Sequence, residues 1–262
     1  MTTSRVRLAP GLRVTERRDG SLQVGLQVDR RLVLPDQRPV RELLARLRHP
    51  VDPAGLSDAE RVLAERLAAA GLLDDVNDVA RRTATRSAAP IEVVADDAAG
   101  ALARRLLVEA GLTAARGPDA PALTLVVTGG AEPPRPDLDR LAQADRPHLP
   151  VTSVAGRVRV GPCVVPGLTA CVRCVDEHLA DRDPSHPRLV AEHLVADRAD
   201  VPRPADLALG LAWAVRDVVA LLDGDRPTTW SATVDLTPGG PVTHEWRRHP
   251  RCGCAWGDLL AV

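Results

Sequence analysis

The chain has 262 residues and a formal net charge of −1, from 34 basic and 35 acidic side chains. This length fits one large domain or two modest ones. The near-neutral charge argues against a dedicated nucleic-acid surface, which normally carries an excess of basic residues. No run of about 18 uncharged apolar residues is present, so we expect no membrane-spanning segment.

The composition also limits the chemistry. The chain contains no Lys, Phe or Tyr, so no lysine can clamp a phosphate or form a Schiff base. Base stacking could come only from Trp213, Trp230, Trp246 and Trp256. The first residues contain no apolar stretch of signal-peptide length, and we therefore expect a cytoplasmic protein.

The N-terminal 75 residues predict a small α+β domain that resembles a winged helix. Residues 11–34 read as a β-meander, with the turn signal R-R-D-G between the first two strands. Leu22, Val24, Leu26 and Val28 alternate with other residues and predict one half-buried strand. The third strand is R-L-V-L, residues 31–34.

Two helices are expected to follow this meander. The first covers residues 40–48, and the second begins at Ser57, which has the spacing of a capping box with Glu60, and ends before Gly71. The apolar face predicted for the second helix consists of Ala59, Val62, Leu63, Leu67 and Ala70.

Residues 76–90 are polar, basic and weakly patterned, and are predicted to be a linker. From residue 91 to 262, apolar strands alternate with helices, as in the first half of a doubly wound α/β domain. Predicted strands cover residues 91–95, 112–116, 122–128, 148–154, 157–162, 230–236 and 241–246. Predicted helices include residues 138–144, 187–198 and 205–223.

Four cysteines form two short-spaced pairs, C-x-x-C at Cys171 and Cys174 and C-x-C at Cys252 and Cys254. Two such pairs predict a closed, structural Zn²⁺ site with four thiolate ligands. A redox motif and disulfides remain the alternatives. Cys163 is expected to be a small buried apolar residue.

Three other polar residues near these cysteines are expected to have structural rather than catalytic roles. His178 and His249 would be metal ligands only if one thiol did not serve. Asp183, which precedes a proline, is expected to define a turn ahead of the next helix rather than to act as an acid or base.

Three motifs carry a resemblance to a known family: G-P-x-V-x-P-G-x-T-A-C-x-R-C from residue 161, D-R-D-P-x-x-P from residue 181 and H-P-x-C-x-C from residue 249. They resemble the ThiF-type, ubiquitin-activating-enzyme-like proteins of azole-forming ribosomal peptide biosynthesis, which are cyclodehydratase partners or leader-peptide-binding proteins. The match covers residues 151–256. The resemblance implies zinc on Cys171, Cys174, Cys252 and Cys254, a winged-helix element that takes up the leader peptide as an added strand, and a separate YcaO-type enzyme for the ATP-dependent chemistry.

The sequence departs from this family where a nucleotide would bind. The turn after the first strand of the α/β part is A-D-D-A-A-G, in which Asp96 and Asp97 would face the phosphates and Gly100 is the one glycine. Arg116 stands where an acidic residue usually holds the ribose, with Asp119 nearby. Asp96 and Asp97 are equally satisfactory as helix N-cap residues. We therefore expect a degenerate Rossmann-like domain that does not bind ATP.

These observations favour a non-catalytic scaffold that binds a leader peptide, a YcaO-type enzyme or both, and that could form a homodimer. The peptide would be held by β-augmentation on the 31–34 strand, beside the second helix. An active ATP-dependent adenylyltransferase or cyclodehydratase subunit is the first alternative, and a zinc-containing winged-helix regulator is the second. The residues predicted to contact the peptide are Arg31, Leu32, Val33, Leu34, Leu63 and Leu67.

Overall fold

The computed structural model describes residues 4–95, 97–115, 120–154, 156–194 and 203–254. The chain divides into two compact units, Met1–Ala84 and Thr85–Val262, and each unit has a hydrophobic core of its own. No helix of the described ranges is both long and apolar enough to cross a bilayer.

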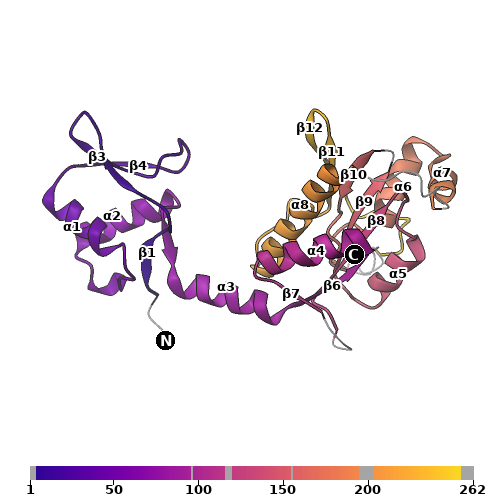
Figure 1. Cartoon of the computed structure of the whole chain (residues 1–262), viewed down its shortest axis with the longest axis horizontal. Coiled ribbons are helices and arrows are strands. Elements are labelled where there is room, and N and C mark those ends of the chain that lie inside the picture. The colour runs from indigo at the N-terminus through magenta and orange to yellow at the C-terminus, as the bar shows by residue number, and fades with distance from the viewer. Residues whose placement is uncertain (1–3, 96, 116–119, 155, 195–202, 255–262) are drawn as a thin grey trace. The chain divides into compact units, whose positions relative to one another are not determined.

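The first unit is built around a three-stranded antiparallel meander, as predicted. Its strands are β2 (Val14–Glu16), β3 (Ser21–Val24) and β4 (Leu32–Pro35), with β3 in the centre (Figure 1). Leu22 and Val24 of β3 point to the same face as Leu34 of β4, because alternate residues of a strand share a face. That face is covered by α1 (Arg38–Arg46) and α2 (Asp58–Ala69).

The predicted extension of the central strand is wrong. β3 ends at Val24, and Leu26 and Val28 are 83% and 81% exposed. The cause is Gly25, whose φ of +81° turns the chain out of the strand. A Cβ at residue 25 would collide with the carbonyl oxygen of Arg30, because the 25–31 loop folds back on itself.

The second helix follows its sequence signals. Ser57 and Glu60 form the predicted capping box, in which each side chain accepts the backbone N–H of the other residue. Leu67 lies in the core, whereas Val62 is 57% exposed and does not belong to the buried face. A further two-stranded sheet, formed by β1 (Val6–Leu8) and β5 (Leu73–Asp75), was not expected from the sequence.

Residues 76–90, predicted to be a linker, contain the helix α3 (Val76–Ala88). Asp75 starts this helix, because its Oδ1 accepts the N–H of Asn77 at 2.9 Å. Asp78 and Arg82 add an ion pair of 2.7 Å, four residues apart. α3 has no buried residue among those described, and besides the local pairs its Arg86 forms an ion pair with Asp223.

The second unit contains a seven-stranded mixed sheet in the order β12-β11-β10-β9-β8-β6-β7 (Figure 1). β7, β6, β8 and β9 are parallel, and β10, β11 and β12 continue the sheet as antiparallel strands. The predicted mixed α/β architecture is confirmed. The strands are β6 (Pro90–Val94), β7 (Thr113–Ala114), β8 (Leu123–Gly129), β9 (His148–Val154), β10 (Arg157–Val160), β11 (Ala232–Thr237) and β12 (Gly240–Glu245).

Helices cover both faces of this sheet. α4 (Asp97–Glu109) and α8 (Pro204–Leu222) pack with Leu125 and Val127 of β8 in the main core. Val126 points to the other face, where it contacts α5 (Arg135–Gln143) and α6 (Val172–Arg182). α7 (His186–His193) follows α6.

Candidate functional site

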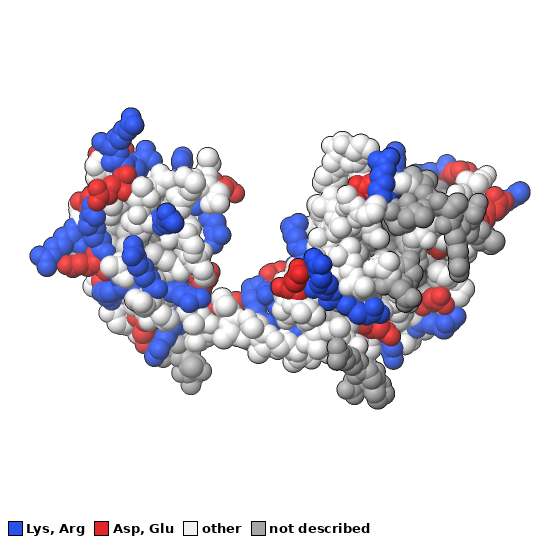
Figure 2. Space-filling view, in the orientation of Figure 1, with Lys and Arg blue, Asp and Glu red and all other residues white. Residues whose placement is uncertain are grey.

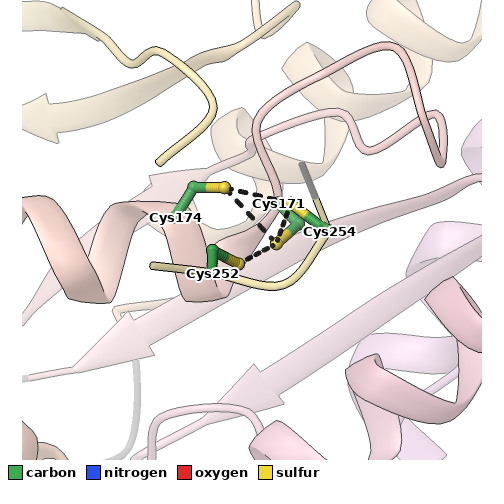
Figure 3. Close-up of side chains that lie close together, drawn as sticks. All are labelled: Cys171, Cys174, Cys252 and Cys254. Atoms are coloured by element: carbon green, nitrogen blue, oxygen red, sulfur yellow. Dashed lines mark hydrogen bonds between the residues drawn. The ribbon is translucent and has the colours of Figure 1, made fainter. Parts of the chain in front are cut away.

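The four predicted cysteines come together in the second unit and form a tetracysteine cluster (Figure 3). The Sγ atom of Cys171 lies 3.8 Å from that of Cys174, 3.4 Å from that of Cys252 and 3.6 Å from that of Cys254. The Sγ atoms of Cys174 and Cys254 are 3.2 Å apart. Four sulfurs at about 2.3 Å from a tetrahedral Zn²⁺ would be separated by about 3.8 Å. The cluster therefore has the donor set and nearly the size of a tetrathiolate metal site.

The first pair of sulfurs belongs to the beginning of α6. Cys171 is the N-cap residue, and Cys174 lies one turn further on the same side of the helix. The approach to this helix is fixed by Thr169, whose Oγ1 accepts the Val165 N–H at 2.8 Å. The Ala170 N–H donates to Ser231 Oγ at 3.0 Å, which attaches the turn to the start of β11.

The second pair lies in the turn after β12. The backbone N–H of His249 donates to Cys174 Sγ at 3.3 Å, a contact that suits a thiolate acceptor. The hydrogen bonds that Cys171 makes to the other three cysteines, and then burial, raise the pKa of its thiol. Thiolates crowded together repel one another, and a divalent cation would remove this repulsion.

The two histidines near the cluster are held by other partners. His249 is 4% exposed; its Nδ1 accepts the Arg251 N–H at 3.2 Å, so its proton lies on Nε2, which faces Asp181 at 3.0 Å. His178 Nε2 bonds to the carbonyl oxygen of Arg247 at 2.9 Å. His178, Asp181 and His249 also lie close enough to hold a metal ion. A metal on His249 Nε2 would force the proton onto Nδ1, against the Arg251 N–H.

Two further residues are placed as the sequence indicated. Cys163 is fully buried, and burial raises the pKa of its thiol to about 12. Asp183 follows α6, and its Oδ1 accepts the Ser185 N–H at 2.9 Å in the turn before α7.

Sequence reasoning missed the polar contacts that support the cluster. Asp217 of α8 is 1% exposed and accepts hydrogen bonds from the backbone N–H and hydroxyl groups of Thr228 and Thr229, at 2.6 to 3.1 Å. This carboxylate fixes the loop that leads to Ser231. Arg135 of α5, 5% exposed, forms a bidentate pair with Asp176 on α6 at 2.8 and 2.9 Å. Neither pair has a sequence spacing that could have revealed it.

Part of the predicted degenerate nucleotide site can be placed. α4 begins at Asp97, directly after the loop that follows β6, and Gly100 lies in its first turn against Arg104. Asp96, Arg116 and Asp119 lie outside the described residues.

The residues predicted to contact a peptide occupy two environments. Leu34 and Leu67 are 1% and 0% exposed and belong to the core of the first unit. Leu63 and Leu32 are partly buried against this core. Val33 of β4 is 41% exposed, and Arg31, directly before β4, is exposed. β4 pairs only with β3 among the described strands.

Comparison with solved structures shows which known proteins share this fold. The heterocyclase TruD matches over 96% of this chain, with a TM-score of 0.74 and 16% sequence identity. The chain has the fold found in TruD. It spans 43% of the TruD chain, and 39% of a heterocyclase solved in complex with substrate and cofactor, which matches at a TM-score of 0.70 and 16% identity.

Escherichia coli MccB, solved with AMPCPP and MccA, matches over 96% of this chain and 99% of its own length, with a TM-score of 0.66 and 9% identity. No protein-family model and no curated protein sequence matches the chain. At these identities the likeness establishes the fold, and the resemblance noted in the sequence is confirmed at that level.

Proposed function

We propose that this chain is a non-catalytic scaffold that binds a precursor peptide in ribosomal azole-type peptide biosynthesis. The observation that carries the proposal is the exposed edge of β4 in the small first unit, in a chain whose second unit has the fold found in TruD and MccB. An extended peptide can add to such an edge through backbone hydrogen bonds, which need no particular side chains on the protein. The first unit would serve as the winged-helix-type recognition element.

The contact residues of this proposal are those at the surface. Arg31, Leu32 and Val33 would face the added strand, and Leu63 would border it. Leu34 and Leu67 would support the strand and the helix from within the core.

The tetracysteine cluster would hold a structural Zn²⁺. Its four donors fill a tetrahedral shell and leave no open position for water or substrate, which is the arrangement of a structural rather than a catalytic zinc. The metal would join α6 to the turn after β12 and make the second unit a firm platform. That platform would dock a YcaO-type enzyme or a second copy of the chain.

The proposal is tested by peptide binding to the full chain. Leader segments encoded near its gene, labelled with fluorescein, should bind in an anisotropy titration, and Val33→Asp should weaken binding at least tenfold, because it places a charge at the edge where an apolar side chain would pack. Val108→Asp is the matched control, since Val108 is 64% exposed on α4 of the second unit. Equal affinities for the two variants would reject the β4 edge as the binding surface.

An active adenylyltransferase is the second candidate, because the MccB structures that share this fold include one with ATP. ATP–pyrophosphate exchange by the zinc-loaded chain, in the presence of the leader peptide, would support this candidate against the scaffold. Absence of exchange, together with no ATP-dependent thermal shift, would support the scaffold.

A further inference from the structure

The first unit carries a concavity of about 530 Å³ on the face of its sheet that points away from α1 and α2. Arg13, Thr15 and Arg17 line it along β2, and Gln23 lines it from β3. These residues alternate with Val14, Leu22 and Val24, which face the core, so the concavity lies on the opposite side of the sheet. We call it the outer-face concavity. Its lining contains no residue of β4.

The outer-face concavity is cationic. Three arginines line it and no acidic residue does. Arg30 donates Nε to the Gly71 carbonyl at 2.7 Å. Arg17 donates to Gln23 at 2.8 Å and is ion-paired with Asp19 at 3.3 Å, so the charges available to a ligand are those of Arg13 and Arg30. Arg13 is exposed, and within the described ranges its guanidinium makes no hydrogen bond or ion pair. Figure 2 shows basic side chains over much of the visible face of this unit, with acidic side chains between them.

An apolar rim adjoins these charges. Leu26, 83% exposed, lines the concavity from the 25–31 loop, and Leu12 lines it from the segment before β2. The start of the loop is held by hydrogen bonds to its neighbours: the Gly25 N–H donates to the Arg13 carbonyl at 3.3 Å, and Gln23 Nε2 of β3 donates to the Gly25 carbonyl at 2.8 Å. Leu26 is therefore presented to solvent by a fixed backbone, which lowers the ordering cost when a ligand covers it.

The arginines and the exposed leucine of the concavity indicate which class of ligand would bind there. Free guanidinium donors bind carboxylates, and an exposed leucine beside them suits an apolar side chain in the same ligand. An extended peptide presents side chains alternately, so its carboxylates and apolar groups can follow one another along a strand. Nucleic acid fits less well, because all four tryptophans lie in the second unit and Phe and Tyr are absent, which leaves the first unit without these aromatic side chains for base stacking.

We propose that the outer-face concavity binds an extended acidic peptide segment, with carboxylates on Arg13 and Arg30 and an apolar side chain on Leu26. The inference rests on the proposed function in taking a peptide as the ligand. It names a second surface of the same unit, and an acidic stretch outside the segment that pairs with β4 would occupy it.

The test uses the full chain and two fluorescein-labelled 12-residue peptides, one alternating Glu and Leu and one alternating Gln and Leu. In anisotropy titrations at low salt, the acidic peptide should bind at least tenfold more tightly than its amide counterpart, and the difference should shrink as salt is added. Arg13→Gln and Leu26→Ser should each weaken binding of the acidic peptide about fivefold. Arg18→Gln, which removes the same charge outside the concavity, should change it less than twofold.

Equal binding of the two peptides, or equal effects of Arg13→Gln and Arg18→Gln, would overturn the inference. So would a labelled oligothymidine that binds more tightly than the acidic peptide and loses affinity in Arg13→Gln. Circular dichroism of each variant shows whether the unit remains folded. Val33 pairs with Gln23, which lines the concavity, so Arg13→Gln separates the two surfaces. Leader segments that bind Arg13→Gln normally but Val33→Asp weakly report on the β4 edge, whereas an acidic peptide that loses affinity in Arg13→Gln reports on the concavity.

Discussion

Loss of the proposed Zn²⁺ should destabilise the second unit and leave the first unit unchanged. With Zn²⁺ bound, the cluster would cross-link the chain between residues 81 positions apart, as Cys171 and Cys252 are. The loop-closure entropy removed by a cross-link of this span corresponds to about 4.5 kcal/mol at 25 °C. For a unit of this size, a loss of that magnitude should lower the melting temperature by roughly 9–18 °C.

Differential scanning calorimetry of the zinc-loaded chain, with and without 1,10-phenanthroline, measures this shift. Cys252→Ser should reproduce the effect of the chelator, and Cys163→Ala, which removes a buried thiol outside the cluster, should retain one zinc per chain by metal analysis. The reasoning would be refuted if the chelator left both transitions in place, or if Cys163→Ala lost its metal as Cys252→Ser does.

Three further changes test the second unit. Asp217→Asn should cost about 3 kcal/mol in urea unfolding, because its amide would face donors of Thr228 and Thr229; an unchanged midpoint would show that this carboxylate is dispensable. Because the pKa of Cys163 is raised to about 12, its contribution to the free energy of unfolding is complete below about pH 9. Above that pH the free energy of unfolding should fall by about 1.4 kcal/mol per pH unit, and Cys163→Ala should lack this pH dependence. Gly210→Ala should lower the free energy of unfolding by about 1–2 kcal/mol, since the new Cβ would lie 2.5 Å from a methyl group of Val158 on β10. A stabilised variant would mean that the higher helix propensity of alanine outweighs this overlap.

The parts of the fold that local patterns determine were predictable from the sequence. Continuous apolar runs such as that of β8 indicated buried parallel strands, and Ser57 with Glu60 located the start of α2. The cysteine spacings predicted which four side chains would meet, because two short-spaced thiol pairs are typical of a tetrathiolate site.

Other parts depend on interactions that leave no local pattern. The alternation through Leu26 and Val28 indicated a longer strand, but Gly25 took a left-handed conformation that the alternation does not encode. β5 is Leu-Asp-Asp and gains its pairing from β1, about 70 residues earlier in the chain, so its own residues gave no strand signal. α3 is stabilised by side-chain pairs although none of its described residues is buried. The exposed residues of β4 could be separated from its buried ones only once the helices were placed.

The order of the cysteines along the chain has a consequence for biogenesis. At about 5–20 residues per second, a ribosome needs roughly 4–16 s to travel from the first thiol pair to the second. Throughout that interval the nascent polypeptide has only Cys171 and Cys174 of the four cluster thiols, too few to complete the proposed tetrahedral shell. β11 and β12 are also synthesised in this gap, so both strands are complete before the second thiol pair is available. Loading of the proposed Zn²⁺ should therefore depend on the supply of free zinc and on a reducing environment that keeps the early dithiol from oxidising.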